Sequence, residues 1–239
     1  MKPMKAFVMG VGWVTAAGLG RGREGKFSWG QGALPEITRK QVFPEPQPHF
    51  GRMDLYSKLG VAAIVLALRD AGMECGDGER PYSLIASSVH GCLRTDSDFY
   101  ETVCQKGPRY ASPHLFAYTV ANTFLGEAAI QLGLTGPTFL LNEPNLSGRM
   151  ALLTALGLLA TSESEVAVTG VCDVGPPALI APNDSPFGAL FFVLAADPGH
   201  GRPYGGLTGD RDNILFEGEP FDEITGLAAL LSGLAAPPS

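Results

Sequence analysis

Three polar side chains that could do chemistry stand directly before a leucine- and alanine-rich run. Glu143, Asn145 and Ser147 alternate there, and Gly148 separates them from the apolar residues 150–160. The run is apolar on nearly every face, which predicts a helix buried between layers. The N–H groups at the start of a buried helix can hold an anion, a carbonyl oxygen or a nucleophile. The sequence therefore predicts a candidate site centred on Asn145.

Asn145 and Glu143 each admit a structural role beside a chemical one. The asparagine side chain is a neutral amide without a route to nucleophilic activation, and asparagine is favoured as a helix N-cap. We therefore expect Asn145 to cap the helix. A carboxylate near a helix start more often balances the helix dipole than transfers a proton, so Glu143 is expected to be a dipole partner.

The composition bounds the class of protein. The chain has 239 residues, of which 45% are hydrophobic, and its apolar runs are too short to cross a bilayer. No basic-then-apolar leader precedes them, so we expect a cytoplasmic protein that does not bind a membrane. His90 and Cys92 lack further ligands nearby, so neither a metal nor a cofactor is expected. The cysteines form no CxxC pair and are expected to be reduced; they are Cys75, Cys92, Cys104 and Cys172.

Charge is unevenly distributed along the chain. Residues 1–58 carry a net charge of +5, whereas the remainder carries −12. Such a protein is a poor nucleic-acid binder, but its basic end could steer an acidic protein partner. Arg21, Arg23 and Lys26 are the candidate dock, and ordinary solvated surface charge is an equally good explanation.

Strand and helix patterns alternate over the first 170 residues. Apolar runs predict strands at 5–15, 83–89, 138–141, 165–171 and 188–195, and helical periodicity predicts helices from residue 54, over 122–132, 150–160 and 224–234. This order favours an α/β fold with a mixed, mainly parallel sheet and helices on both faces. Residues 1–196 are expected to form one domain that contains a long loop at 16–50, and residues 197–239 an extension packing on it.

Four segments follow one another in a particular order within the first 175 residues. They are the strand and glycine turn Val8–Gly18, the pair 52–54 and 67–72, the helix and Gly-Pro turn 122–137, and the strand 166–170. Together they resemble the amino-terminal half of the β-ketoacyl synthases, thiolase-fold enzymes of fatty-acid and polyketide assembly. The resemblance implies a thiolase-like half-domain with a buried central helix.

The same resemblance identifies what Asn145 replaces. The family's nucleophile motif falls on Pro144, Asn145, Leu146, Ser147 and Gly148, with asparagine at the position of the acylated cysteine. The resemblance therefore implies that Asn145 stands at the nucleophile-equivalent position and cannot form the family's thioester. The former site then comprises these residues and Glu143. The family's second half supplies histidines that this chain lacks, since His49, His90, His114 and His200 lie in no matching motif.

The resemblance implies a catalytically silent subunit, or an acyl- or carrier-protein-binding module, similar in role to a chain-length factor. It implies a homodimer, or a heterodimer with a complete ketosynthase, that contacts through the strand Phe191–Val193 or the sheet edge. Acyl carrier protein is a further candidate partner. The alternative is half of a split condensing or malonyl-decarboxylating enzyme, completed by a chain that supplies the histidines. In neither case is the chain expected to be active alone.

Overall fold

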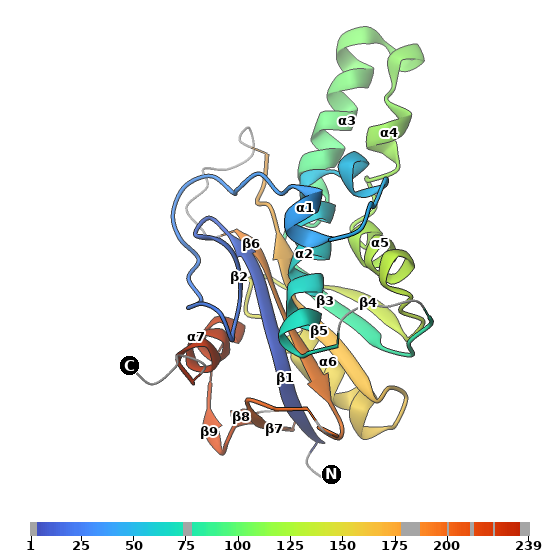
Figure 1. The fold of residues 1–239 in the computed structure, drawn as a ribbon. Coiled ribbons are helices and arrows are strands. Elements are labelled where there is room, and N and C mark those ends of the chain that lie inside the picture. The colour runs from blue at the N-terminus through green and yellow to red at the C-terminus, as the bar shows by residue number, and fades with distance from the viewer. Residues whose placement is uncertain are drawn as a thin grey trace.

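A mixed sheet of nine strands organises the part of the chain that the structure describes (Figure 1). The structure is a computed structural model that describes residues 4–73, 78–177, 187–199, 201–210, 213–221 and 223–234. The strands lie in the order β4-β3-β5-β6-β1-β7-β8-β9, and β2 pairs with β1 beside this path. They are β1 (Met4–Thr15), β2 (Gly18–Arg21), β3 (Ser83–Ser88), β4 (Thr138–Asn142), β5 (Val166–Asp173), β6 (Gly188–Ala195), β7 (Gly205–Gly209), β8 (Ile214–Phe216) and β9 (Glu219–Pro220).

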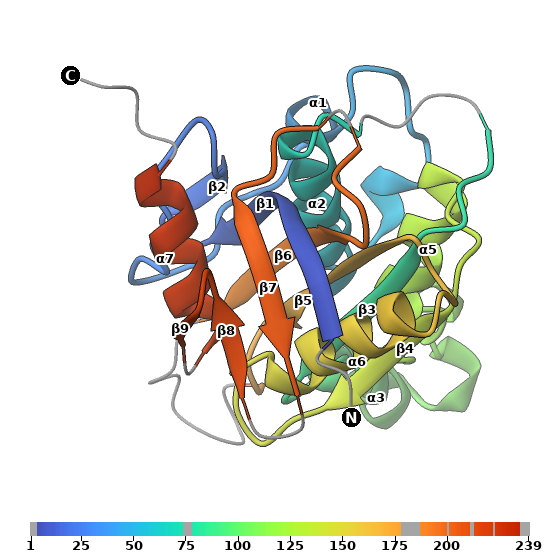
Figure 2. The same cartoon turned by 90° about the horizontal axis from the view of Figure 1, so that it is seen from below.

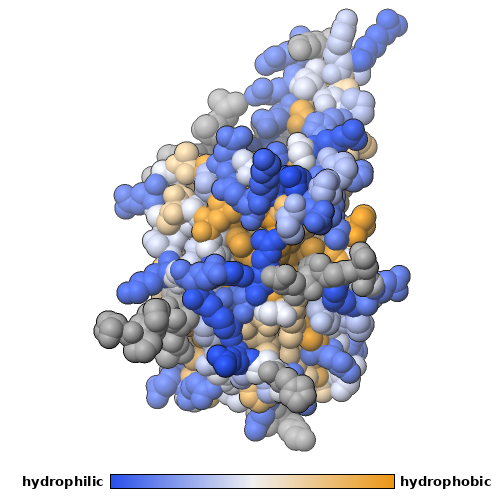
Figure 3. Space-filling view, in the orientation of Figure 1, coloured by the Kyte–Doolittle hydropathy of each residue, from blue (hydrophilic) through white to orange (hydrophobic). Residues whose placement is uncertain are grey.

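Helices cover both faces of this sheet, as predicted. On one face α2 packs against the sheet and α5 against α2, and on the other face lie α6 and α7 (Figures 1 and 2). Figure 3 shows apolar atoms at the surface over α2 and α5, where Ile130 of α5 is 82% exposed. The helices are α1 (Arg39–Val42), α2 (Leu55–Asp70), α3 (Leu93–Lys106), α4 (Pro113–Phe116), α5 (Thr123–Leu132), α6 (Arg149–Ala160) and α7 (Ile224–Leu234), with single 3-10 turns at Phe50–Arg52 and Pro108–Tyr110.

Helix α2 begins and ends where local signals in the sequence place it. The carboxylate of Asp54 accepts a hydrogen bond from the backbone N–H of Ser57 at 2.9 Å and so caps the first turn. Gly72 follows the last turn with φ of +67°, a conformation that glycine adopts without strain. Helix α2 can lie close against β1 because Gly12 has no side chain: a Cβ there would lie 2.3 Å from the backbone nitrogen of Ala67.

The sheet is mixed, but the expectation that it is mainly parallel is wrong. Among the described strands, only the pairs β3–β4 and β3–β5 are parallel. β6 instead runs antiparallel to both β5 and β1, and β7 is antiparallel to β1. The strand at 188–195 was expected to be antiparallel, and its pairing with β5 confirms this. The alternation of patterns over the first 170 residues predicted parallel pairing there, but β1 pairs with the antiparallel strands β2, β6 and β7.

Two parts of the chain contain more regular structure than the sequence predicted. No helix or strand was predicted for the polar stretch before Ser112, but it forms α3, which projects with α4 from the body (Figure 1). Residues 197–239, expected to pack on the body, supply β7, β8 and β9 to the same sheet in addition to the predicted helix α7. The predicted loop at 16–50 also contains the short elements β2 and α1.

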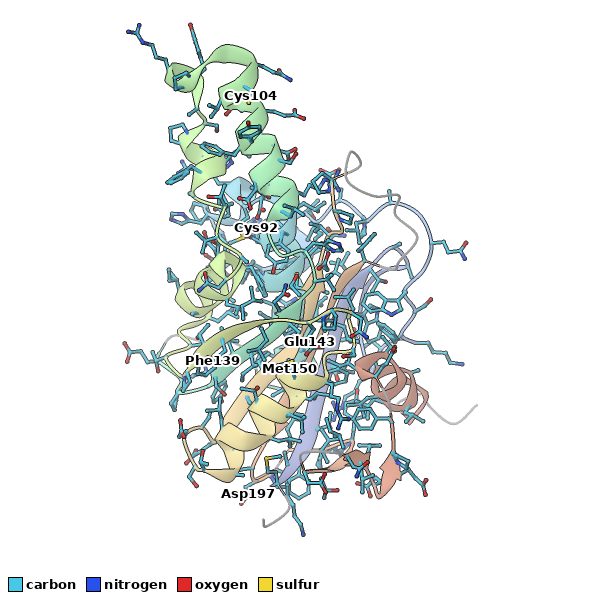
Figure 4. All side chains as sticks on the ribbon, turned by 180° about the vertical axis from the view of Figure 1, so that it is seen from behind. Cys92, Cys104, Phe139, Glu143, Met150 and Asp197 are labelled. Carbon is cyan, nitrogen blue, oxygen red and sulfur yellow. The ribbon has the colours of Figure 1, made fainter. Side chains whose placement is uncertain are left out.

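Helix α6 is not buried on all sides, which corrects the prediction of a fully buried central helix. It buries one apolar face against β1, β3 and β5, including Leu152 and Leu156. Its opposite face is open, since Met150 is 51% exposed and Ala160 is also exposed (Figure 4). This difference could not be predicted from the sequence, because both faces of the helix are apolar.

The strand proposed as a partner contact lies in the middle of the sheet. Phe191, Phe192 and Val193 belong to β6, which pairs with β5 on one side and β1 on the other, and all three side chains are fully buried. The default expectation of an internal core strand is therefore confirmed for these residues, and of the two candidate contacts the sheet edge remains. Among the described residues, no helix combines the length and hydropathy that crossing a bilayer requires.

Candidate functional site

Glu143 anchors the start of α6. Its buried carboxylate accepts hydrogen bonds from Ser87 Oγ at 2.7 Å, from Ser147 Oγ at 2.8 Å and from the backbone N–H of Met150 at 2.7 Å (Figure 4). The Met150 bond satisfies an N–H group that no intrahelical acceptor can reach, and the carboxylate lies at the positive end of the helix dipole. Glu143 is thus the dipole partner that the sequence predicted.

Asn145 does not cap α6, which corrects the structural role expected for it. Its Oδ1 accepts a hydrogen bond from the backbone N–H of Ser147 at 3.3 Å, two residues along the chain. The N-cap residue is Gly148, which has no side chain, and Glu143 supplies the acceptor instead. Asn145 is exposed on the turn before the helix. Its amide nitrogen Nδ2 takes no part in the hydrogen bond that Oδ1 accepts.

Gly148 joins the start of α6 to the carboxyl-terminal helix α7. Its φ is +65°, and a Cβ there would lie 2.8 Å from Ile224 Cδ1 and 3.0 Å from Val171 Cγ1. The backbone N–H of Ile224 donates to the carbonyl of Ser147 at 2.9 Å. The first residue of α7 is therefore packed against the turn that carries Asn145.

Replacing Gly148 with alanine is expected to destabilise the fold by about 1 to 3 kcal/mol, because the new methyl group meets Ile224 in a left-handed backbone conformation. Thermal unfolding followed by circular dichroism measures the loss. Gly157 on the open face of α6 is the matched control, since a Cβ there meets nothing within 4 Å and alanine favours the helix. Equal melting temperatures for the two variants would contradict the packing described here.

A cavity of about 450 Å³ opens beside this turn. Four segments far apart in the sequence meet at it: the turn that carries Asn145, the end of β3, the end of β5 and the start of α7. Half of its lining residues are apolar, and the other five carry polar side chains, two of them carboxylates. The lining residues are Trp29, Val89, His90, Pro144, Asn145, Leu146, Asp173, Phe187, Glu223 and Thr225.

Within this cavity His90 is held by a buried carboxylate. His90 Nδ1 lies 3.1 Å from Asp173 Oδ1, and the backbone N–H of His90 donates to Asp173 Oδ2 at 2.8 Å. Asp173 Oδ2 also accepts from Ser88 Oγ and from the backbone N–H of Val89, both at 2.9 Å, and Oδ1 accepts from the N–H of Gly175 at 2.7 Å. A carboxylate that is fully buried and bonded in this way fixes the position of the imidazole.

His90 was not predicted to belong to the site. In the sequence it has no further metal ligands nearby and lies in no motif of the family. His90 and Asp173 are 83 residues apart, and their proximity follows from the parallel pairing of β3 with β5. Side chains at the carboxyl ends of adjacent parallel strands share one edge of a sheet. A histidine and an aspartate at two predicted strand ends were the available signal.

Two buried cysteines of the chain are not reactive thiols. Burial raises the pKa of the Cys172 thiol well above its ordinary value, and burial together with Asp96 raises that of Cys92 to about 11. Both thiols are therefore protonated and poorly nucleophilic near neutral pH. Cys104 is exposed on α3, in the projecting hairpin (Figure 4), and Cys75 lies outside the described residues. The described residues contain no cluster of three metal-ligating side chains.

The three residues of the predicted basic dock have different surroundings in the structure. The guanidinium of Arg23 donates to the backbone carbonyls of Asp70 at 2.6 Å and of Met9 at 3.2 Å, and it lies 4.4 Å from the centre of the Tyr204 ring. Arg23 thus has a structural role within the fold. Arg21 forms an ion pair with Glu24, and with Lys26 it lines a second cavity of about 420 Å³, away from Asn145.

Comparison with known protein families matches the middle of the chain to one family model. Residues 28–180 match the family model described as "Beta-ketoacyl synthase, N-terminal domain". Over 121 residues the chain is 29% identical to 3-oxoacyl-[acyl-carrier-protein] synthase 2 of Vibrio cholerae, a match that covers 50% of this chain and 29% of the relative. Over 161 residues it is also 29% identical to the putative polyketide beta-ketoacyl synthase 1 of Streptomyces virginiae, covering 64% of this chain and 36% of the relative. The chain therefore spans about a third of the length of these curated relatives.

Solved structures share the fold. The ishigamide ketosynthase/chain length factor superposes with a TM-score of 0.65 at 17% identity, covering 85% of this chain and 65% of that chain. A ketosynthase in complex with its chain length factor from Xenorhabdus doucetiae gives a TM-score of 0.52 at 19% identity, covering 70% of this chain and 66% of that chain. At these identities the likeness establishes the fold, which is the thiolase-like α/β arrangement predicted from the sequence.

Proposed function

Because the chain belongs to the β-ketoacyl synthase family through its amino-terminal domain, we propose that it is a synthase-like subunit of fatty-acid or polyketide-type assembly that is silent in condensation. Its role is similar to that of a chain-length factor. It works beside a complete ketosynthase, whose own site forms the acyl-enzyme and the new carbon–carbon bond.

The observation that carries this proposal is the environment of Asn145. The neutral amide at the nucleophile-equivalent position cannot be acylated as a thiolate can. In addition, the buried carboxylate of Glu143 already occupies the helix N-terminus through its bond to the N–H of Met150. A second anion at this helix N-terminus is disfavoured by like-charge repulsion, so the start of α6 does not suit a thiolate.

Two exposed regions support a role as a partner subunit. Strand β4 is an edge of the sheet among the described strands, and its Phe139 is 44% exposed (Figure 4). An edge strand with an exposed aromatic side chain offers hydrogen-bonding groups and apolar area to another chain. The projecting hairpin of α3 and α4 adds exposed aromatic residues, namely Tyr100, Tyr110 and Phe116. These surfaces serve a heterodimer with a ketosynthase or, less specifically, a homodimer.

The proposal predicts that Asn145 is dispensable for assembly. The variant Asn145→Ala should form the same complex with its ketosynthase as the unaltered chain, because the side chain is exposed and makes one local hydrogen bond. The product of the reconstituted complex should also be unchanged in kind. Native mass spectrometry of the complex purified from the source cell, followed by product analysis after reconstitution, checks both points.

The control is a reconstitution in which the ketosynthase partner lacks its own nucleophile, and it should make no condensation product. Loss of product on changing Asn145 alone would count against a silent role. Release of carbon dioxide from malonyl carrier protein by the chain together with a partner would favour the alternative, a split malonyl-decarboxylating enzyme. Absence of any ketosynthase in the purified complex would contradict the proposed partner.

Contact with acyl carrier protein is a further part of the proposal. One structurally similar complex is described as a type II polyketide acyl-carrier protein with its ketosynthase, at 13% identity and a TM-score of 0.60. Carrier proteins that are acidic would favour the basic amino-terminal region of this chain. Since Arg23 is bound within the fold, Lys26 and the ion-paired Arg21 are the side chains that remain for such a dock.

A further inference from the structure

The pairing of His90 with Asp173 determines which imidazole nitrogen faces the cavity. Asp173 accepts hydrogen bonds from four other donors, so it also acts as acceptor toward the ring and places the proton on Nδ1. In the neutral ring Nε2 then carries the lone pair. His90 lines the cavity and its ring is partly exposed, so this nitrogen can accept a proton from a group bound there.

Water is the nucleophile that this arrangement can activate. The hydroxyl of Ser147 donates to Glu143 at 2.8 Å, and Ser147 does not line the cavity. The thiols of Cys92 and Cys172 are held protonated, and neither residue lines the cavity. Thr225 supplies a hydroxyl at the cavity, and this hydroxyl donates to Glu223 Oε2 at 3.3 Å rather than to His90. His90 is therefore placed to act as a general base toward water.

The other cavity residues supply a place for an acyl group and its oxygen. Asn145 keeps Oδ1 bonded to Ser147, so the hydrogens of its Nδ2 amide can bond a developing oxyanion. Apolar side chains from Trp29, Leu146 and Phe187 line the same space and suit a hydrocarbon chain. One cavity thus combines an oriented base, a hydrogen-bond donor and an apolar wall, which are three components of hydrolytic sites.

We propose that this cavity hydrolyses acyl thioesters, with His90 as general base and Asp173 as the residue that positions it. His90 Nε2 takes a proton from water as the water oxygen bonds to the thioester carbonyl carbon, whose oxygen becomes an anion held by Asn145. The carbon–sulfur bond then breaks, and the thiolate takes the proton from His90. The products are a carboxylic acid and a thiol. Hydrolysis goes beyond the proposed function, on which only the choice of a thioester as substrate rests.

The charges at the cavity select among acyl groups. Glu223 lines the cavity, and it contributes a second carboxylate beside the buried Asp173. A malonyl group carries a carboxylate of its own and would be repelled, whereas a neutral saturated acyl chain would not. The neutral chain is therefore the expected substrate, and the carboxylate that hydrolysis creates is expelled by the same repulsion.

Hydrolysis of the hexanoyl thioester of N-acetylcysteamine by the full chain tests this inference, with the released acid measured by chromatography. His90→Gln is expected to lower kcat/KM about 100-fold or more, because glutamine cannot accept and return the proton. His114→Gln is the matched control, since His114 lies on α4 and does not line the cavity. The malonyl thioester should react more slowly than the hexanoyl thioester.

A rate for the unaltered chain no higher than that of protein-free buffer would overturn the inference, and so would an undiminished rate in His90→Gln. Circular dichroism melting of His90→Gln separates loss of the base from loss of the fold, and Asn145→Ala provides a second variant. Its turn is exposed, and it should lower kcat by about 10- to 100-fold. Because the assay uses no partner chain, its failure leaves complex formation with a ketosynthase unaffected, and the two proposals fail separately.

Discussion

Replacing Glu143 with alanine is expected to lower the stability of the protein by about 2 to 4 kcal/mol, or its melting temperature by about 5 to 15 °C. The change removes the shared acceptor of Ser87 Oγ, Ser147 Oγ and the N–H of Met150. The two hydroxyls can turn toward other acceptors, but the N–H at the start of α6 cannot. The first turn of α6 should therefore lose most of its order, which amide hydrogen exchange at Met150 would report.

The conservative variant Glu143→Gln distinguishes hydrogen bonding from charge. Its carbonyl oxygen can keep the bonds to Ser87 and Met150, while its amide group can donate to the hydroxyl of Ser147. Less than half of the loss seen with alanine is expected. Glu101→Ala, an exposed change on α3, should stay within about 0.5 kcal/mol of the unaltered chain. If Glu143→Ala were equally neutral, the carboxylate would not anchor α6, and the main support for a silent site would be removed.

Replacing Asp70 with alanine is expected to destabilise the fold by about 2 to 4 kcal/mol, since it leaves several hydrogen-bond donors without their shared acceptor. Asp70 receives hydrogen bonds from the backbone N–H of Val11 at 2.9 Å, from that of Arg23 at 2.8 Å and from Tyr204 Oη at 2.8 Å. It therefore joins the end of α2 to β1, to the loop after β2 and to the residue just before β7. Burial and the bond to Asp70 raise the pKa of Tyr204, which keeps its hydroxyl a donor.

Urea unfolding measures this loss, with the slope of the transition as a check that one cooperative unit unfolds. Asp98→Ala is the matched control, because Asp98 is an exposed aspartate on α3. Asp70→Asn keeps one oxygen and should fall between the control and the alanine variant. An effect of Asp70→Ala below about 1 kcal/mol would contradict the role assigned to this junction. A transition with two steps would show that residues after 197 unfold separately from the rest of the sheet.

Local signals in the sequence determined most of the secondary structure. Asp54 and Gly72 mark the ends of α2 because a cap and a left-handed turn act within a few residues. The same holds for Gly133 after α5. The strands β7 to β9 were not predicted, because they are short or glycine-rich and join the sheet through the pairing of β7 with the distant strand β1. Helix α3 was not predicted because its sequence is mostly polar.

Sequence motifs also determined the family, and they predict that Asn145 stands at the family's nucleophile position. The tertiary structure decided what surrounds it. Whether Asn145 or Glu143 bonds the first turn of α6 depends on the left-handed turn at Gly148, and that turn is set by its packing against Ile224 of α7. Whether His90 is a loop residue or an oriented base depends on the pairing of β3 with β5, which brings Asp173 to it. Capping and periodicity depend on residues close together in the sequence, so they can be predicted from it. Side chains 83 residues apart come into contact only when their strands pair in the folded sheet.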